Sequence, residues 1–173
     1  MIDSPEFSHP VDVLRLPSQG AKYSLKASPA ECAALAKRFG LLSLARLSAE
    51  VDLSPMPGGF YRVDAELSAE LEQACIVTLE PVASRLEETF TLLFGEVGSE
   101  SELVLDSVEE TVEPLEGGII DIGETVAQQL SLALDPFPRA PGAEIPGGEA
   151  VFEDPEPKSP FAALAKLRKS QGD

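Results

Sequence analysis

The sequence has no tryptophan, one histidine, two cysteines and two methionines among its 173 residues. Such a chain offers little of the histidine and cysteine that serve most often as general base, thiol nucleophile and zinc ligand. No stretch approaches the roughly 18 uninterrupted apolar residues of a membrane span, and the first residues lack the cationic and apolar regions of a secretion signal. We therefore expect a reduced, cytoplasmic protein with free thiols, no cofactor and no membrane contact.

Basic residues are also scarce. The chain carries 30 acidic and 13 basic side chains, a formal charge of −17, and has no lysine or arginine between Arg85 and Arg139. Negative charge of this density repels phosphate and attracts cationic groups. It argues against direct nucleic-acid contact and favours a basic protein as partner, although a solvated acidic face would need no partner at all.

Two long stretches alternate apolar and polar residues with a period of two. They cover residues 45–53 and 63–71, and the Pro/Gly-rich segment 54–59 between them is typical of a chain reversal. A third stretch has apolar residues on one parity: Leu86, Phe90, Leu92 and Phe94. The pattern predicts a three-stranded antiparallel meander with one apolar face, with further strands expected at residues 11–16 and 23–27.

Two helices are indicated by their caps. Ser28, Pro29 and Glu31 form a capping-box sequence before a helix that Gly40 ends. Its apolar stripe consists of Cys32, Leu35, Ala36 and Phe39. A capping pattern at residues 121–124 begins the second helix, whose stripe is Ile122, Val126, Ala127, Leu130, Ala133 and Leu134, with Leu132 expected to pack beside it. The predicted fold class is α+β, an antiparallel meander packed by two main helices. The sequence does not decide whether the sheet curls into a partly barrel-like form.

The composition divides the chain into three parts. Residues 1–139 form the α+β domain, residues 140–158 read as a disordered Pro/Gly/Glu linker, and residues 159–173 form a short basic amphipathic tail peptide. In the tail, Phe161, Leu164 and Leu167 share one helical face, with Arg168 beside it. So short a helix needs a surface on which to form, so the tail is either a partner-binding peptide or a frayed end.

Residues 95–118 are rich in glycine, serine and acids, and a long excursion of this kind is typical of a functional or disordered loop. We predict that it binds the partner through Glu109, Glu110, Glu113 and Glu116. A carboxylate metal site or an acid/base pair would need converging ligands or separated pKa values, which the sequence does not demonstrate. No catalytic, cofactor or metal residues are therefore assigned.

Four short elements resemble the YceD family, also known as domain of unknown function 177. They are the Cys75-x-x-x-Leu79-Glu80-Pro81 element, Glu113-Pro114-Leu115, residues 120–124 and residues 129–139, in that order along the chain. Family members commonly carry a second cysteine where this chain has Thr78. Because Cys75 alone supplies one of the four ligands of a structural zinc site, we expect a small buried residue at a strand end.

The resemblance implies a role in the accumulation of large-subunit (23S) ribosomal RNA, and hence in large ribosomal subunit biogenesis. The net negative charge indicates how the protein would fulfil this role: an acidic surface would hold a basic ribosomal protein or rRNA-processing factor. One alternative is an acidic nucleic-acid mimic that inhibits a DNA- or RNA-binding protein. An enzyme is the other, and the inventory argues against it, because His9 is expected in a disordered start and neither cysteine has an evident activating partner.

Overall fold

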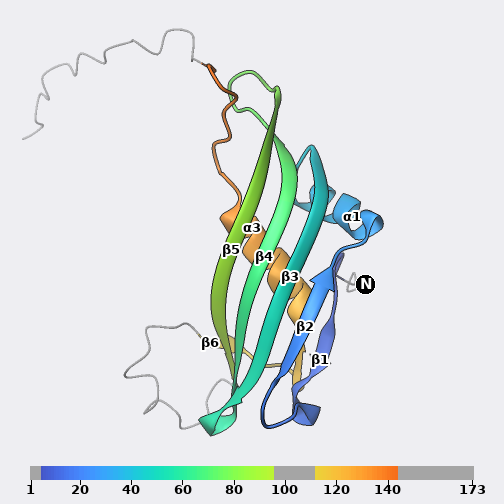
Figure 1. Cartoon of the computed structure of the whole chain (residues 1–173), viewed down its shortest axis with the longest axis vertical. Coiled ribbons are helices and arrows are strands. Elements are labelled where there is room, and N and C mark those ends of the chain that lie inside the picture. Colours follow the sequence, from blue (N-terminus) through green and yellow to red (C-terminus); the bar gives the residue numbers. More distant parts are fainter. Residues whose placement is uncertain (1–4, 96–111, 144–173) are drawn as a thin grey trace, which may run out of the picture. The chain divides into compact units, whose positions relative to one another are not determined.

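The computed structural model describes residues 5–95 and 112–143. The chain divides into a compact unit, Met1–Pro141, and a second unit, Gly142–Asp173; the description below concerns the first. Its elements, shown in Figure 1, are β1 (Pro10–Asp12), η1 (Val13–Arg15), β2 (Ala21–Lys26), α1 (Pro29–Phe39), β3 (Ser43–Met56), η2 (Pro57–Gly59), β4 (Phe60–Ala74), β5 (Pro81–Gly95), β6 (Val112–Pro114), β7 (Ile119–Asp121) and α3 (Ile122–Ala133).

A five-stranded sheet with the order β2-β3-β4-β5-β6 forms the centre of this unit. The four long strands pair antiparallel in chain order, and β6 joins β5 in parallel. Strands β1 and β7 form a separate antiparallel pair. The predicted α+β meander is therefore confirmed, and among the described residues the sheet stays open, with β2 and β6 as its outer strands.

The central strands follow the alternating pattern with one interruption. From Leu47 to Leu53 in β3, and from Val63 to Leu71 in β4, every second residue is buried. The prediction that this pattern begins at Ala45 was wrong. A register shift between Leu44 and Arg46 makes Leu44 the buried residue and leaves Ala45 exposed, because a bulge moves one residue out of the alternation.

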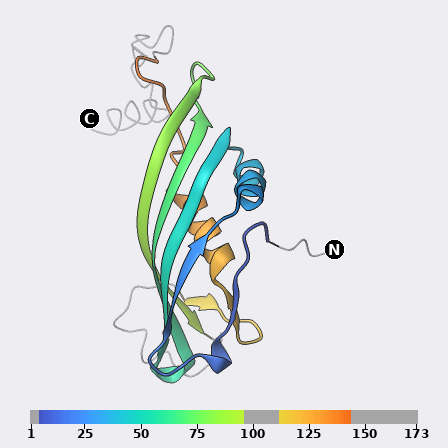
Figure 2. The ribbon, with the colours of Figure 1, turned by 45° about the vertical axis from the view of Figure 1, so that its right-hand side comes forward.

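Helices α1 and α3 lie on the same side of the sheet (Figures 1 and 2), where they cover its apolar face. The capping box of α1 is confirmed: the Ser28 hydroxyl accepts the N–H of Glu31 at 3.3 Å, and the Glu31 carboxylate accepts the N–H of Ser28 at 2.7 Å. Asp121 caps α3 by accepting the N–H groups of Gly123 and Glu124. Leu132 does not pack as expected, since it is 76% exposed.

The start of the described chain is ordered, contrary to the prediction of a disordered N-terminus. Phe7 is buried, and the N–H of His9 donates to the Asp121 carboxylate at 2.7 Å. The carbonyl of His9 accepts the N–H of Ile122 at 3.1 Å, while its side chain remains exposed. The strand expected at residues 11–16 is only partly present, because β1 ends at Asp12 and η1 follows.

The core lies between the sheet and the two helices. Its most fully buried large side chains are Leu35, Leu47, Leu53, Val63, Ile120, Ile122, Val126 and Leu130. Transfer of such side chains from water stabilises the fold by roughly 1.5–3 kcal/mol each. None of the described helices has the length and apolar character needed to cross a membrane.

Candidate functional site

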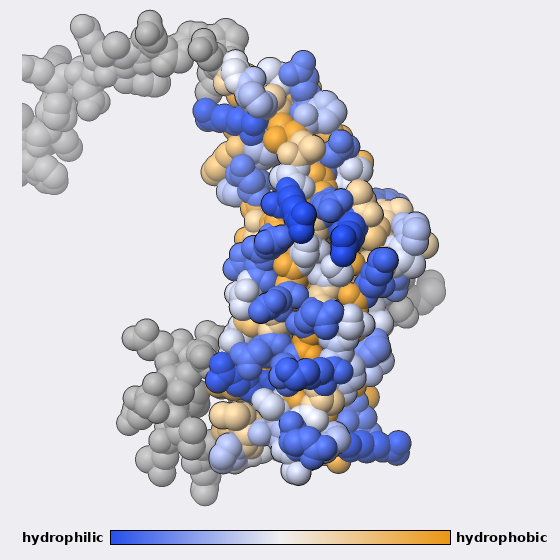
Figure 3. Space-filling view, in the orientation of Figure 1, coloured by the Kyte–Doolittle hydropathy of each residue, from blue (hydrophilic) through white to orange (hydrophobic). Residues whose placement is uncertain are grey.

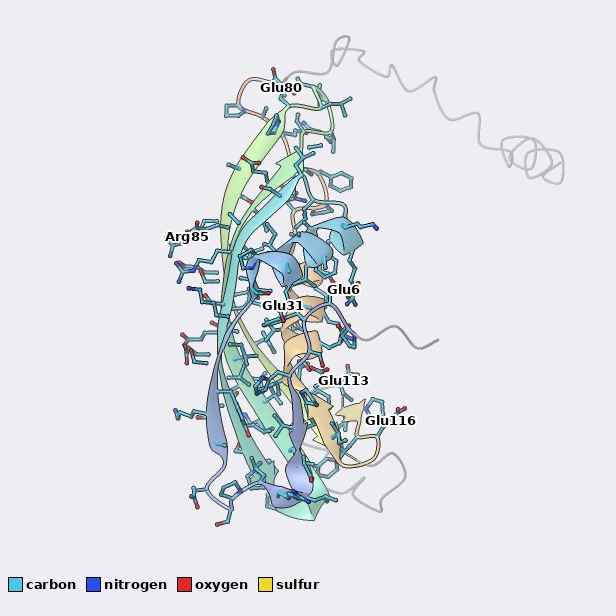
Figure 4. The ribbon with its side chains drawn as sticks, turned by 90° about the vertical axis from the view of Figure 1, so that its right-hand side faces the viewer. Glu6, Glu31, Glu80, Arg85, Glu113 and Glu116 are labelled. Carbon is cyan, nitrogen blue, oxygen red and sulfur yellow. The ribbon has the colours of Figure 1, made fainter. Side chains whose placement is uncertain are left out.

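The side of the sheet that carries no helix, called here the open face, is covered by polar and charged side chains (Figure 3). Figure 4 shows Arg85 on this side, pointing away from the helices. Its charged residues are the carboxylates of Glu50, Asp52, Asp64, Glu66, Glu70, Glu72 and Glu87 and the basic groups of Lys22, Lys26, Arg46, Arg62 and Arg85. The open face consists of the polar residues that alternate along the strands with the buried apolar residues of the core.

The pairing of β3 with β4 places carboxylates directly opposite each other at the centre of this face. Glu50 pairs with Glu66, and Asp52 pairs with Asp64. Like charges at directly opposed positions destabilise a sheet. This central acidic block, Glu50, Asp52, Asp64 and Glu66, is therefore not a consequence of sheet stability.

Half of the central acidic block is neutralised within the protein. Asp52 lies 3.0 Å from the ammonium of Lys22, which raises the pKa of Lys22. Asp64 lies 2.9 Å from the guanidinium of Arg62 and accepts the hydroxyl of Thr91 at 2.6 Å. Burial would raise the pKa of Asp64, but the hydrogen bonds from Thr91 and Arg62 outweigh it and lower the pKa.

The other half, Glu50 and Glu66, forms no ion pair with a basic side chain in residues 5–95 and 112–143. Glu50 accepts the hydroxyl of Ser24 at 2.6 Å, and Glu66 has no hydrogen bond or ion pair to another residue in the described part of the chain. Two shallow depressions of about 320 and 550 Å³ share Glu50, Glu66 and Thr89 in their linings, and the larger also reaches Arg46, Arg85 and Glu87. Such a surface suits a lysine or arginine side chain of a partner.

The acidic residues predicted from the sequence lie elsewhere. Glu113 is in β6 and Glu116 follows it in the turn to β7; both are exposed. Figure 4 shows them toward the helix side of the sheet, away from Arg85. The remaining predicted partner-binding residues, Glu109, Glu110, Phe161, Leu164, Leu167 and Arg168, fall outside the described residues.

Sequence reasoning missed the central acidic block, although its residues were visible as polar positions of two alternating strands. What brings Glu50 opposite Glu66 is the β3–β4 register, and a hairpin register depends on the turn geometry. It also missed β6. Three residues are too few to show a period, and residues 96–111 separate β6 from its partner β5 in the sequence.

Cys75, directly after β4, is fully buried, as predicted. Its sulfur accepts three backbone N–H groups, from Ala140 at 3.3 Å and from Val77 and Thr78 at 3.4 Å. These donors, with that of Ala140 contributing most, lower the pKa of Cys75 to about 6. Because these donors are backbone groups, one of them 65 residues away, no activating partner for Cys75 was evident in the sequence.

Cys32 behaves as expected for a core residue, since it is buried and burial raises the pKa of its thiol. Thr78, where the resemblance noted above implies a second cysteine, donates its N–H to the sulfur of Cys75 and its hydroxyl to the carboxylate of Glu80. Within residues 5–95 and 112–143, no cluster of three or more histidine, cysteine, aspartate or glutamate side chains could hold a metal ion.

Comparison with known families decides the relationship. The model of the family described as "Large ribosomal RNA subunit accumulation protein YceD" matches residues 63–168, more than half of the chain. The chain belongs to the YceD family. The YceD match begins in β4 and takes in β5, the Cys75 turn, β6, β7 and α3, and the family name connects the protein with large-subunit ribosomal RNA. Searches of curated proteins and of solved structures found no match.

Proposed function

We propose that this YceD-family protein is a non-enzymatic factor in large ribosomal subunit biogenesis. It supports accumulation of 23S ribosomal RNA by holding a basic ribosomal protein or rRNA-processing factor on the open face of its sheet. The observation that carries the proposal is the Glu50–Glu66 pair, two exposed, directly opposed carboxylates that form no ion pair within the described part of the chain. A lysine or arginine side chain of a partner would relieve the repulsion between these two carboxylates, and this gain would favour binding at the pair.

The same face is poorly suited to RNA. Binding by counterion release needs lysine and arginine side chains gathered at phosphates. Three of the five basic groups on the open face are already in ion pairs: Lys22 with Asp52, Arg62 with Asp64, and Arg85 with Glu87. With a net charge of −17, the protein repels free RNA and attracts the positively charged proteins that bind it.

Two further contacts belong to the proposal as secondary sites. Glu113 and Glu116 supply exposed negative charge at β6 and the following turn, with Glu109 and Glu110 before them in the chain. Phe161, Leu164, Leu167 and Arg168 supply an amphipathic basic peptide. Weak sites joined within one chain bind more tightly together than either does alone.

A matched pair of variants tests where the partner binds. Glu50→Gln/Glu66→Gln and Glu113→Gln/Glu116→Gln each remove two negative charges from exposed positions. We expect purified basic large-subunit proteins to bind the second variant, which loses only a secondary contact, somewhat less well than the wild type and the first variant markedly less. In cells depleted of the protein, 23S RNA should fall relative to 16S RNA, and the second variant should restore it more fully than the first.

Two outcomes would contradict the proposal. One is equal binding and equal restoration by both variants. The other is saturation of the purified protein by naked large-subunit RNA at submicromolar concentration and physiological ionic strength, because the charge balance forbids such binding.

The paired rows of carboxylates on β3 and β4 also favour a second candidate, an acidic mimic of nucleic acid. A mimic would compete with DNA or RNA for one protein and would inhibit it. The two candidates separate in the depletion experiment, since loss of a mimic releases its target without lowering the amount of 23S RNA.

A further inference from the structure

Strand β5 has one edge, called here its free edge, that is paired over only three residues by the described part of the chain. On one side it pairs with β4 over its length, from Pro81 opposite Ala74 to Phe94 opposite Tyr61. On the other side, β6 pairs only with Leu93–Gly95. For residues 81–92, the described chain supplies no strand on the outer side, and Figure 1 shows β5 as the outer strand with β6 beside one end only.

One hydrogen bond shows which residues of β5 direct their backbone N–H and C=O groups away from β4. The carbonyl of Gly95 turns toward β6, where it accepts the N–H of Leu115 at 2.8 Å. Because the β4–β5 register has no shift, every second residue before Gly95 turns its N–H and C=O outward in the same way. Arg85, Glu87 and Thr89 therefore turn outward backbone groups that no described residue pairs, and their side chains lie on the open face.

The even-numbered residues of β5 provide an apolar strip on the other face. Leu86 and Phe90 are half-buried and pack against the core, so part of each side chain remains open to the edge. Glu88 lies on the same parity, opposite Leu67, but is exposed. The edge thus combines outward backbone groups, apolar side chains, the carboxylate of Glu88 and that of Glu87, which is in an exposed ion pair with Arg85.

These features favour a basic partner over a second copy of the chain. A charged residue on the inward-facing parity of an edge strand is a common device against pairing with identical strands. Glu88 holds that position here. Copies that each carry a net charge of −17 also repel one another.

We propose that the free edge of β5, residues 81–92, binds an extended basic segment of the partner protein, which adds to the sheet as a further antiparallel strand. The inference rests on the proposed function in that the partner is taken to be basic. Alternate side chains of the added strand lie on the two faces. Those on the open face are lysine or arginine, near Glu87 and the depression that contains Glu66. Those on the other face are apolar beside Leu86 and Phe90, with a basic residue beside Glu88.

Backbone methylation of a model peptide separates strand addition from simple charge attraction. The probe is a peptide of alternating lysine and valine, about ten residues long to match the free edge. One version is N-methylated at its lysines and another at its valines, so that charge and side chains stay equal. In an antiparallel addition the residues opposite Glu87 and Thr89 exchange hydrogen bonds with them, and these residues are the lysines.

We expect lysine N-methylation to weaken binding at least about tenfold and valine N-methylation to leave it nearly unchanged. If only the valine-methylated peptide lost affinity, the peptide would add as a parallel strand, because in that direction the valine N–H groups bond to the edge. Equal binding of all three peptides would overturn strand addition. If that binding were still weakened in Glu50→Gln/Glu66→Gln, the proposed function would survive without it.

Amide hydrogen exchange in the full chain tests whether the edge is free. Without peptide, the N–H groups of Arg85, Glu87 and Thr89 should exchange quickly, while those of Leu86 and Phe90, bonded to β4, should be protected. Added peptide should protect the first set. Protection of that set in the free protein would show that another segment or a second copy already occupies the edge, and would overturn the inference.

The contribution of charge at the edge is measured with Glu87→Gln/Glu88→Gln. We expect this variant to bind the unmodified peptide several-fold more weakly than Glu113→Gln/Glu116→Gln, which loses the same charge at a distance. Equal weakening by the two variants would contradict a binding site at the edge of β5.

Discussion

The sulfur of Cys75 accepts the backbone N–H of Ala140 at 3.3 Å, which ties the end of β4 to a segment 65 residues later in the chain. Together with the N–H groups of Val77 and Thr78, this contact surrounds a buried thiol with donors that favour its ionised form. The turn after β4 and the segment after α3 are therefore joined by a group whose charge depends on pH.

This contact predicts a pH dependence of stability. The pKa of Cys75 is lowered from 9.0 to about 6 on folding, so the unfolded chain binds more protons between these values. The thiolate's contribution is fully present above pH 9 and is lost as the pH falls through 6. We expect the free energy of unfolding from urea titrations to rise between pH 6 and pH 9 more steeply in the wild type than in Cys75→Ser, which does not ionise.

Cys32→Ser is the matched control, because the pKa of Cys32 is raised rather than lowered. Its slope between pH 6 and pH 8 should follow that of the wild type. If Cys75→Ser showed the wild-type slope as well, the three N–H donors would not stabilise a thiolate.

The capping box of α1 predicts the effect of Ser28→Ala. The variant removes the acceptor for the Glu31 N–H and should destabilise the protein by about 1 kcal/mol. The hydrogen bonds with Ser28 lower the pKa of Glu31 below 4.5, so the box is complete above that pH and is lost as the pH falls through the folded value. Thermal unfolding should therefore show the largest difference near neutrality. A constant difference down to pH 3 would exclude the role of the Glu31 carboxylate.

Gly123→Ala tests how the N-terminal segment packs on α3. A β-carbon at position 123 would lie 2.8 Å from both the nitrogen of His9 and the carbonyl oxygen of Phe7. Although alanine favours helix more than glycine does, we expect a loss of about 1–3 kcal/mol, because backbone must move to make room. Urea unfolding measures it. Ser131→Ala, at an exposed site on the same helix, is the control and should change stability little.

The contacts of Arg38 predict a measurable energetic coupling between α1 and α3. Its two terminal nitrogens lie 2.9 and 2.7 Å from the carboxylate of Glu124, and one of them also lies 2.9 Å from Glu6. A double-mutant cycle with Arg38→Met and Glu124→Gln should give roughly 0.5–1 kcal/mol, since the pair is bidentate and partly shielded. The exposed Arg85–Glu87 pair should give less. A coupling for Arg38 no larger than that of Arg85 would contradict the assigned role.

Much of the fold could be predicted because its signals are local. The Ser28 and Asp121 caps and the alternation in β3, β4 and β5 each lie within a few consecutive residues. The failures lie where distant segments meet. The order of the N-terminus depends on Asp121, more than a hundred residues away, and Leu132 is exposed because the helix turns that part of its surface away from the sheet.

Periodicity, caps and composition were enough to establish an acidic α+β protein with one apolar and one charged sheet face, since these properties depend on the order of neighbouring residues. The pairing of Glu50 with Glu66, the free edge of β5 and the donors around Cys75 could not be read in this way. Each depends on strand register or on contacts between distant segments, and these are settled by the packing of the folded chain as a whole.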